Sequence, residues 1–97
     1  MLNSRQRAQL RALANSIDTV VMVGKGGLDN YVYKTADEAI TARELIKCKV
    51  LETAGITPRE AADDISEKIG ADVVQVIGTK FILYRKNKDE PKIKLVK

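Results

Sequence analysis

The strongest constraint on the fold is a short apolar run, Thr19–Val23, that leads directly into a loop with three glycines. The run is rich in β-branched residues and too short for a helix, so it predicts a strand. Because nearly every position is apolar, we expect this strand to be covered on both faces and to lie in the centre of its sheet. Asp29 follows the loop in the position of an N-cap and predicts that a helix begins there.

Three segments carry apolar residues at helical spacing. The first runs from Ser4 to about Ser16, and the second runs from Asp29 to about Arg43. The third begins with the letters TPRE at residues 57–60, which form a capping box with proline in the first helical position. Gly70 is suited to end that helix in the left-handed conformation.

Two further segments have the composition of strands. In LIKCKVLE, residues 45–52, apolar residues alternate with Lys47 and Lys49, which predicts a half-buried strand with its lysines facing outward and Cys48 in the core. Residues 72–86 hold two β-rich runs around Gly78, Thr79 and Lys80, which predicts a hairpin.

The predicted order is therefore α-β-α-β-α-β-β, an α/β fold. A chain of 97 residues has room for one core, so residues 1–97 are expected to form a single domain. Residues 87–97 mix charges with a few apolar residues after a proline. They predict either a short segment at the sheet edge or a mobile basic tail.

The composition argues against an enzyme. The chain has no histidine, which removes the side chain most often used in acid–base chemistry near neutral pH. Its single cysteine can form neither an intrachain disulfide nor a plausible zinc site, and no cofactor motif is present. We therefore expect no metal, no cofactor and no small-molecule substrate. Without a signal peptide or a membrane span, we expect a cytoplasmic protein that acts as a monomer and has no membrane partner.

The charge is concentrated at the two ends of the chain. The net charge is +4, with about +3 in residues 1–27, −3 in residues 28–70 and +4 in residues 71–97. Basic ends of this kind indicate an acidic partner, with RNA as one candidate.

The letters GKGG, from Gly24 to Gly27, are compatible with two interpretations. A dinucleotide fingerprint is disfavoured because Asp29 stands where its third glycine belongs, and a P-loop is disfavoured by the spacing. Either the glycines make a tight turn between strand and helix, or they let an RNA backbone approach while amides and Lys25 contact phosphate, as G-x-x-G loops do in KH domains. Asp29 weakens the second interpretation, since its carboxylate already lies at the positive end of the helix.

Other candidate residues are equally open to two interpretations. Lys47 and Lys49 are either the hydrated face of a strand or part of an RNA platform, and Arg7 and Arg11 serve either helix solubility or phosphate contact. The aromatic residues that either stack on bases or pack inside the protein are Tyr31, Tyr33, Phe81 and Tyr84.

Five short strings occur together in this chain, spread over residues 10–85. They are LRALA (10–14), VGKGGL (23–28), ELIKCKV (44–50), VVQVIG (73–78) and LYR (83–85). Their order and content resemble the bacterial YhbY-like branch of the CRM domain family, named for chloroplast RNA splicing and ribosome maturation.

The resemblance implies a mixed four-stranded sheet with helices, similar to the C-terminal domain of translation initiation factor 3. It also implies a single CRM-type RNA-binding domain over residues 1–97, associated with precursors of the large ribosomal subunit. Its G-x-x-G loop is the expected RNA-contacting element. The predicted RNA-contacting residues are Gly24, Lys25, Gly26, Gly27, Arg7, Arg11, Lys47, Lys49 and Arg85.

The leading hypothesis is a non-enzymatic RNA-binding protein that acts in ribosome assembly. Contacts to the RNA backbone position a protein without reading sequence, so recognition would depend on RNA shape. The alternative hypothesis is a protein-interaction module that docks its basic face on ribosomal or other acidic proteins.

Overall fold

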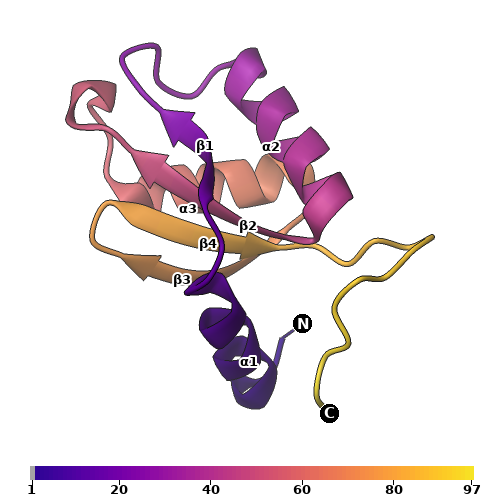
Figure 1. Cartoon of the computed structure of the whole chain (residues 1–97). Coiled ribbons are helices and arrows are strands. Elements are labelled where there is room, and N and C mark those ends of the chain that lie inside the picture. The colour runs from indigo at the N-terminus through magenta and orange to yellow at the C-terminus, as the bar shows by residue number, and fades with distance from the viewer. Residues whose placement is uncertain (1) are drawn as a thin grey trace.

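The computed structural model of the chain describes residues 2–97 and confirms the predicted order of elements (Figure 1). One short 3₁₀ helix, η1, is added between the second strand and the third helix. The elements are α1 (Ser4–Ala14), β1 (Thr19–Val23), α2 (Asn30–Arg43), β2 (Leu45–Val50), η1 (Glu52–Ala54), α3 (Pro58–Ile69), β3 (Asp72–Ile77) and β4 (Lys80–Tyr84).

The helix boundaries follow from local side-chain chemistry. The Asp29 side chain accepts from the Val32 amide at 2.9 Å, and Thr57 and Glu60 form the predicted capping box. Gly70 ends α3 with a φ of 68°, as expected. The first helix also begins with a capping box, which we did not predict: Asn3 accepts from the Gln6 amide, and the Gln6 side chain accepts in return.

The sheet is mixed, as the resemblance implied, with strand order β1-β2-β4-β3. β1 runs parallel to β2, and β4 runs antiparallel to both β2 and β3. The prediction that β1 is central is wrong: β1 is an edge strand, and the lysine-containing β2 is inside the sheet. The apolar run misled us because Val21 and Val23 pack under α2 while Met22, between them, is 55% exposed on the other face.

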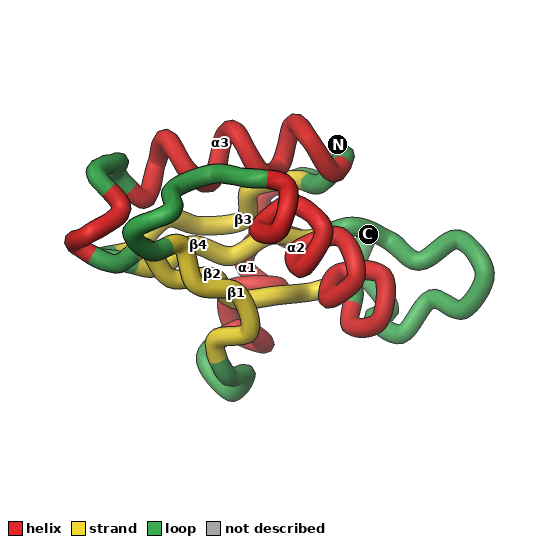
Figure 2. The backbone as a smooth tube through the Cα atoms, turned by 90° about the horizontal axis from the view of Figure 1, so that it is seen from above, coloured by secondary structure: helices red, strands yellow, loops and turns green. Residues whose placement is uncertain are grey.

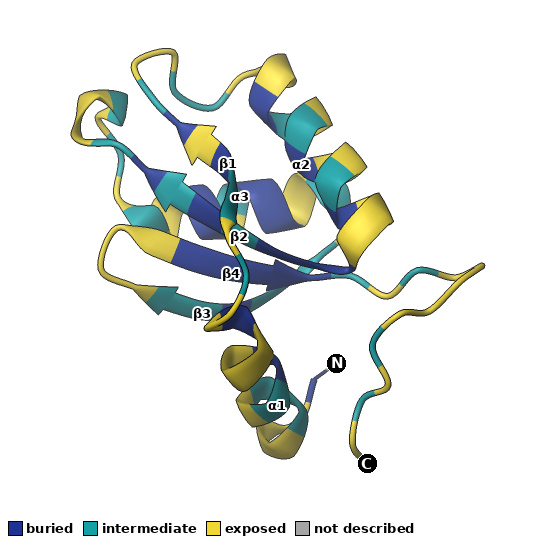
Figure 3. Ribbon diagram, in the orientation of Figure 1, coloured by how far each residue is buried: buried dark blue, intermediate teal, exposed yellow. Residues whose placement is uncertain are grey.

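Two apolar clusters hold the layers together. α2 and α3 cover one face of the sheet and α1 lies on the other, so the sheet separates two cores (Figure 2). Buried positions of β2 and β4 form the middle of both cores, while the outer turns of the helices are exposed (Figure 3). The smaller cluster beneath α1 contains Leu2, Leu10, Ala14, Leu45, Val74, Ile82 and Tyr84, with Ile17, Ile93 and Leu95 packed against it.

The C-terminal segment, residues 85–97, forms no strand, so the expected short edge segment is not found. It is held by Glu44, a fully buried residue between α2 and β2 with a φ of 65°. The Glu44 carboxylate accepts from the amides of Asn87 at 2.7 Å, Lys92 at 2.5 Å and Ile93 at 2.7 Å. Beyond these contacts, Gln6 and Gln9 of α1 hydrogen-bond to the backbone of residues 94–96.

Candidate nucleic-acid interface

The glycine loop is a turn closed by one backbone hydrogen bond. The Gly27 amide donates to the Gly24 carbonyl at 2.8 Å, with Lys25 and Gly26 at the tip. Gly27 has a φ of 69°, in the left-handed region that favours glycine. The left-handed backbone conformation of the turn therefore explains why residue 27 is a glycine.

The other two glycines are not required by the conformation or packing of the loop. Gly24 and Gly26 do not have a positive φ. A Cβ atom at Gly24 would lie 3.5 Å from Leu51 Cδ1, and one at Gly26 would lie 3.4 Å from Asp29 Oδ2, both of which are tolerable contacts. Lys25 thus carries the one side chain between Gly24 and Gly27, and another molecule can approach the backbone at the glycines beside it.

This difference between the glycines can be tested by comparing the free energies of unfolding of two alanine variants. We expect Gly27→Ala to lower the free energy of unfolding by about 1 to 2 kcal/mol, because an alanine in the left-handed region is strained. Gly24→Ala, the matched control, is expected to change it by less than about 0.5 kcal/mol. Urea unfolding followed by circular dichroism measures both, and equal losses would contradict the distinction.

The glycine loop lies beside two other loops at one end of the sheet (Figure 1). The Leu51 amide donates to the Val23 carbonyl at 2.8 Å, and the Val50 amide donates to the Thr79 carbonyl at 2.8 Å. The first bond brings the start of the η1 loop next to the end of β1, and the second brings the β3–β4 turn next to the end of β2. The glycine loop therefore belongs to a group of loops at one end of the sheet.

A row of four residues crosses the sheet next to these loops. Met22 of β1 pairs with Lys49 of β2, Lys49 with Lys80 of β4, and Lys80 with Ile77 of β3. Directly paired residues point to the same face, so this row lies on the face that carries α1. Met22 is 55% exposed and Ile77 is 59% exposed, which shows that α1 does not cover this end. We call these four residues the open row.

The open row places two positive charges side by side. Like charges directly opposite each other in a strand pair are destabilising. Within residues 2–97, neither Lys49 nor Lys80 has an ion-pair partner, and Lys25 and Lys47 have none either. Lys47 is paired with Thr19 and Ile82 on the same face as the open row. Lysines without acidic partners give this part of the surface a positive potential.

The predicted arginines do not join this cluster. Arg7 donates from its guanidinium to the Val73 carbonyl, which ties α1 to β3. Arg85 pairs with Asp37 at 2.7 Å and also donates to the Ile69 carbonyl, so it connects β4 to both α2 and α3. Arg11 is exposed on α1. The structure therefore places Lys47 and Lys49 on the face of the open row, Lys25 at the tip of the glycine loop where β1 ends, and Arg7 and Arg85 in internal contacts.

Lys80 is the basic residue of this surface that we did not predict. Its position in a Gly-Thr-Lys turn indicated only a hairpin, and it becomes informative once the strand order places it opposite Lys49. The signal would have been an exposed lysine at the start of one strand, paired with a lysine of the neighbouring strand, and reading it requires the strand order.

Three of the four aromatic candidates are internal. Phe81 and Tyr84 are buried, and burial raises the pKa of Tyr84. The Tyr33 hydroxyl donates to Asp64, which raises the pKa of Tyr33, and the Lys68 ammonium lies 5.5 Å from the centre of its ring. Tyr31 differs from these three, since it is 77% exposed on the first turn of α2.

Other chemical groups of the chain offer little reactivity. Cys48 is fully buried as predicted, and this burial raises the pKa of its thiol to about 12, so the thiol stays protonated at neutral pH. Within residues 2–97, Cys, Asp and Glu side chains form no group able to hold a metal ion. No helix in that range combines the length and the hydrophobicity that a membrane crossing requires.

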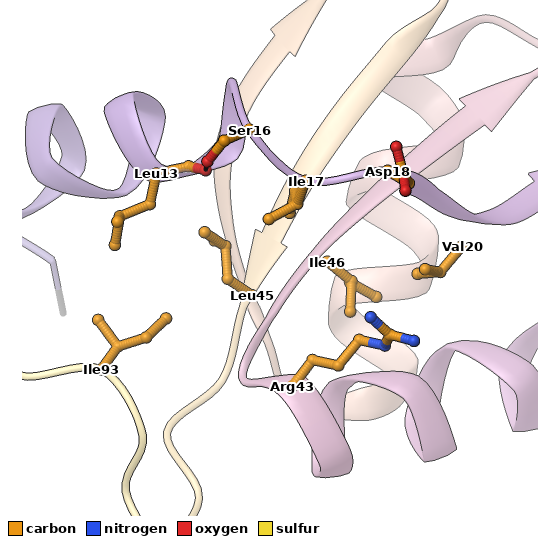
Figure 4. A pocket seen from close by; sticks show the side chains of 9 residues that line it. All are labelled: Leu13, Ser16, Ile17, Asp18, Val20, Arg43, Leu45, Ile46 and Ile93. Atoms are coloured by element: carbon orange, nitrogen blue, oxygen red, sulfur yellow. Dashed lines mark hydrogen bonds between the residues drawn. The ribbon is translucent and has the colours of Figure 1, made fainter.

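A largely apolar pocket of about 260 Å³ lies between the end of α1, the start of β2 and the C-terminal segment (Figure 4). Leu13 and Ile17, from α1 and the segment that follows it, Leu45 of β2 and Ile93 of the C-terminal segment line it. It is found where β2 begins, whereas the glycine loop lies where β1 ends. This pocket therefore belongs to the seam between the C-terminal segment and the sheet rather than to the basic surface.

Comparison with known proteins agrees with this architecture. The CRS1 / YhbY (CRM) domain model matches residues 2–85. The probable RNA-binding protein YqeI of Bacillus subtilis is 34% identical over 95 residues, covering 98% of this chain and 99% of that protein. An RNA-binding protein of Haemophilus influenzae is 35% identical over 94 residues, covering 97% and 94%. The solution structure of SAV1595 from Staphylococcus aureus matches with a TM-score of 0.79 and 35% identity, covering 99% of this chain and all of that one.

Proposed function

The chain belongs to the CRS1 / YhbY (CRM) domain family, and from this premise we propose that it binds RNA through the glycine loop and the open row. The observation that carries the proposal is the pair of glycines, Gly24 and Gly26, that the fold does not need, next to lysines without acidic partners.

The loop offers the RNA backbone both close approach and hydrogen-bond donors. Within residues 2–97, the amides of Lys25 and Gly26 have no acceptor, so they are available to phosphate oxygens. Lys25 adds a charge at the tip, while Asp29 caps α2 and reduces the attraction of that helix end for an anion. Lysine side chains and loop amides, rather than the helix dipole, therefore supply most of the attraction.

The open row and Lys47 extend this contact across the sheet. A phosphate backbone that passes the loop meets Lys49 and Lys80 next, with Met22 and Ile77 available for contact with sugars or bases. Contacts to phosphates hold RNA without reading sequence. The protein would therefore select RNA by shape.

The proposed partner is ribosomal RNA in precursors of the large ribosomal subunit, and the proposed role is in ribosome assembly. This part rests on the family resemblance, because a basic surface alone does not distinguish one RNA from another. Crosslinking the protein to RNA in cells and sequencing the attached fragments tests it directly. Fragments from large-subunit RNA are expected, and an excess of messenger or transfer RNA would contradict it.

The binding mode is tested by a salt titration. The logarithm of the RNA affinity should fall linearly with the logarithm of salt concentration, because phosphate contacts release counterions. We expect Lys25→Glu to weaken binding by about tenfold or more near 0.1 M salt and to reduce the slope by about 1. Filter binding to large-subunit RNA fragments measures both quantities.

Lys88→Glu is the matched control, since Lys88 is an exposed lysine of the C-terminal segment away from the loop. It should bind within about threefold of the unmodified protein and keep most of the slope. Binding that does not respond to salt would contradict a phosphate interface. A protein that still sediments with ribosomal particles after their RNA is digested would favour the alternative, a module that docks on proteins.

A further inference from the structure

A groove of about 330 Å³ runs along the free edge of β1, beside the first two turns of α2. Thr19, Val20 and Met22 line its strand side, and Tyr31 and Thr35 line its helix side. The glycine loop joins β1 to α2, so it closes one end of this groove (Figure 1). The groove is thus continuous with the site proposed above for phosphate.

Tyr31 gives the groove an aromatic wall that the fold does not use. Its side chain is 77% exposed, whereas Tyr33, two residues later, is anchored to Asp64. Met22 also lines the groove and is more than half exposed. The exposed ring of Tyr31 presents apolar area that a flat, polarisable ligand would remove from water.

The strand side of the groove offers hydrogen bonds. β1 pairs only with β2, so the backbone amides and carbonyls on its outer edge have no partner strand. The Thr35 hydroxyl donates to the Tyr31 carbonyl at 2.7 Å and keeps its own oxygen free to accept. Flat apolar walls with donors and acceptors along one edge match a nucleobase.

We propose that this groove holds a base of an unpaired RNA strand, stacked on Tyr31 and hydrogen-bonded to the outer edge of β1. The inference rests on the proposed function, because the loop must hold the neighbouring phosphate. A paired base has its hydrogen-bonding edge occupied and its faces stacked, so the site selects single-stranded RNA over duplex. Asp18, exposed beside Thr19, repels phosphate at the far end and favours entry of the base from the loop.

A tryptophan at position 31 provides a direct test, since the chain has no tryptophan of its own. Stacking of a base on Tyr31→Trp should quench its fluorescence when single-stranded RNA is added. The same titration with duplex RNA should give little quenching. RNA that binds without quenching, or equal quenching by duplex, would overturn the proposal.

Affinity measurements separate this inference from the proposed function. Tyr31→Ala should weaken binding of single-stranded RNA by roughly tenfold, the effect of losing one stacked base, while leaving the salt slope unchanged. Tyr31→Phe keeps the ring and should bind within about twofold. If Tyr31→Ala binds normally but Lys25→Glu lowers the slope, the base site fails and the phosphate site stands. If the unmodified protein binds no RNA, the proposed function fails as well.

Discussion

Replacing Glu44 with alanine is expected to lower the free energy of unfolding by about 3 kcal/mol, a large part of the stability of a domain of this size. The carboxylate accepts from three backbone amides of the C-terminal segment, and its removal leaves these part-buried donors without their protein acceptor. Urea unfolding measures the loss. Amide hydrogen exchange should show reduced protection at Asn87, Lys92 and Ile93.

Two variants separate the carboxylate from other effects. Glu67→Ala, at an exposed position of α3, should change the free energy of unfolding by less than about 0.5 kcal/mol. Glu44→Gly removes the carboxylate but relieves the positive φ, so it should recover about 1 kcal/mol relative to alanine. An alanine variant as stable as the unmodified protein would show that the carboxylate contributes nothing.

The same residue makes stability depend on pH. Burial alone raises the pKa of Glu44, but the amides of Asn87, Ile93 and Lys92, with the charge of Lys92, outweigh burial and leave this pKa below its usual value. A carboxyl whose pKa is lower in the folded state stabilises the protein above its unfolded pKa. That contribution is lost as pH falls through the folded pKa, and Glu44→Gln should abolish it.

Reversing both charges of the open row, Lys49→Glu with Lys80→Glu, should weaken RNA binding by more than about 100-fold near 0.1 M salt. Each phosphate contact contributes about tenfold at that salt concentration through counterion release, and the new carboxylates add repulsion. Filter binding at several salt concentrations should give a slope reduced by about 2.

Neutral variants at the same positions provide the control for folding. Lys49→Met with Lys80→Met removes two like charges that face each other in a strand pair, so the free energy of unfolding should stay equal or rise. RNA affinity should still fall by about 100-fold. A double methionine variant that binds RNA normally would exclude the open row from the interface.

Local patterns predicted most of the elements correctly, because they depend on residues close together in sequence. The capping box at Thr57 and Glu60, the N-cap at Asp29 and the helix end at Gly70 are examples. The alternation around Cys48 also predicted the buried face of β2. Each of these signals involves neighbours within four positions.

The order of the strands could not be predicted from such local patterns. Thr19–Val23 looked central because its apolar residues were counted without knowing which strand pairs with it. For the same reason, Lys80 could be assigned to the basic surface only after the strand order had placed it opposite Lys49. Glu44 was missed altogether, since the amides that it binds follow 43 to 49 residues later in the chain.

The sequence predicted only part of the candidate site. The glycine loop with Lys25, and the outward lysines of β2, were found from the letters alone. Whether an arginine is free or internally bound depends on distant partners, and Arg7 contacts a carbonyl 66 residues away. Sequence patterns could therefore propose basic residues without separating Lys25 and Lys49 from Arg7 and Arg85.

The smaller cluster beneath α1 joins the two ends of the chain, since Leu2 and Leu10 meet Tyr84, Ile93 and Leu95 there. During synthesis the first helix therefore has no completed surface to pack on until residues 84–95 have left the ribosome. The larger core can assemble earlier only in part, because Phe81 and Leu83 of the last strand also belong to it. Folding of this domain is expected to follow synthesis of residues 81–95 rather than accompany the growth of the segments before them.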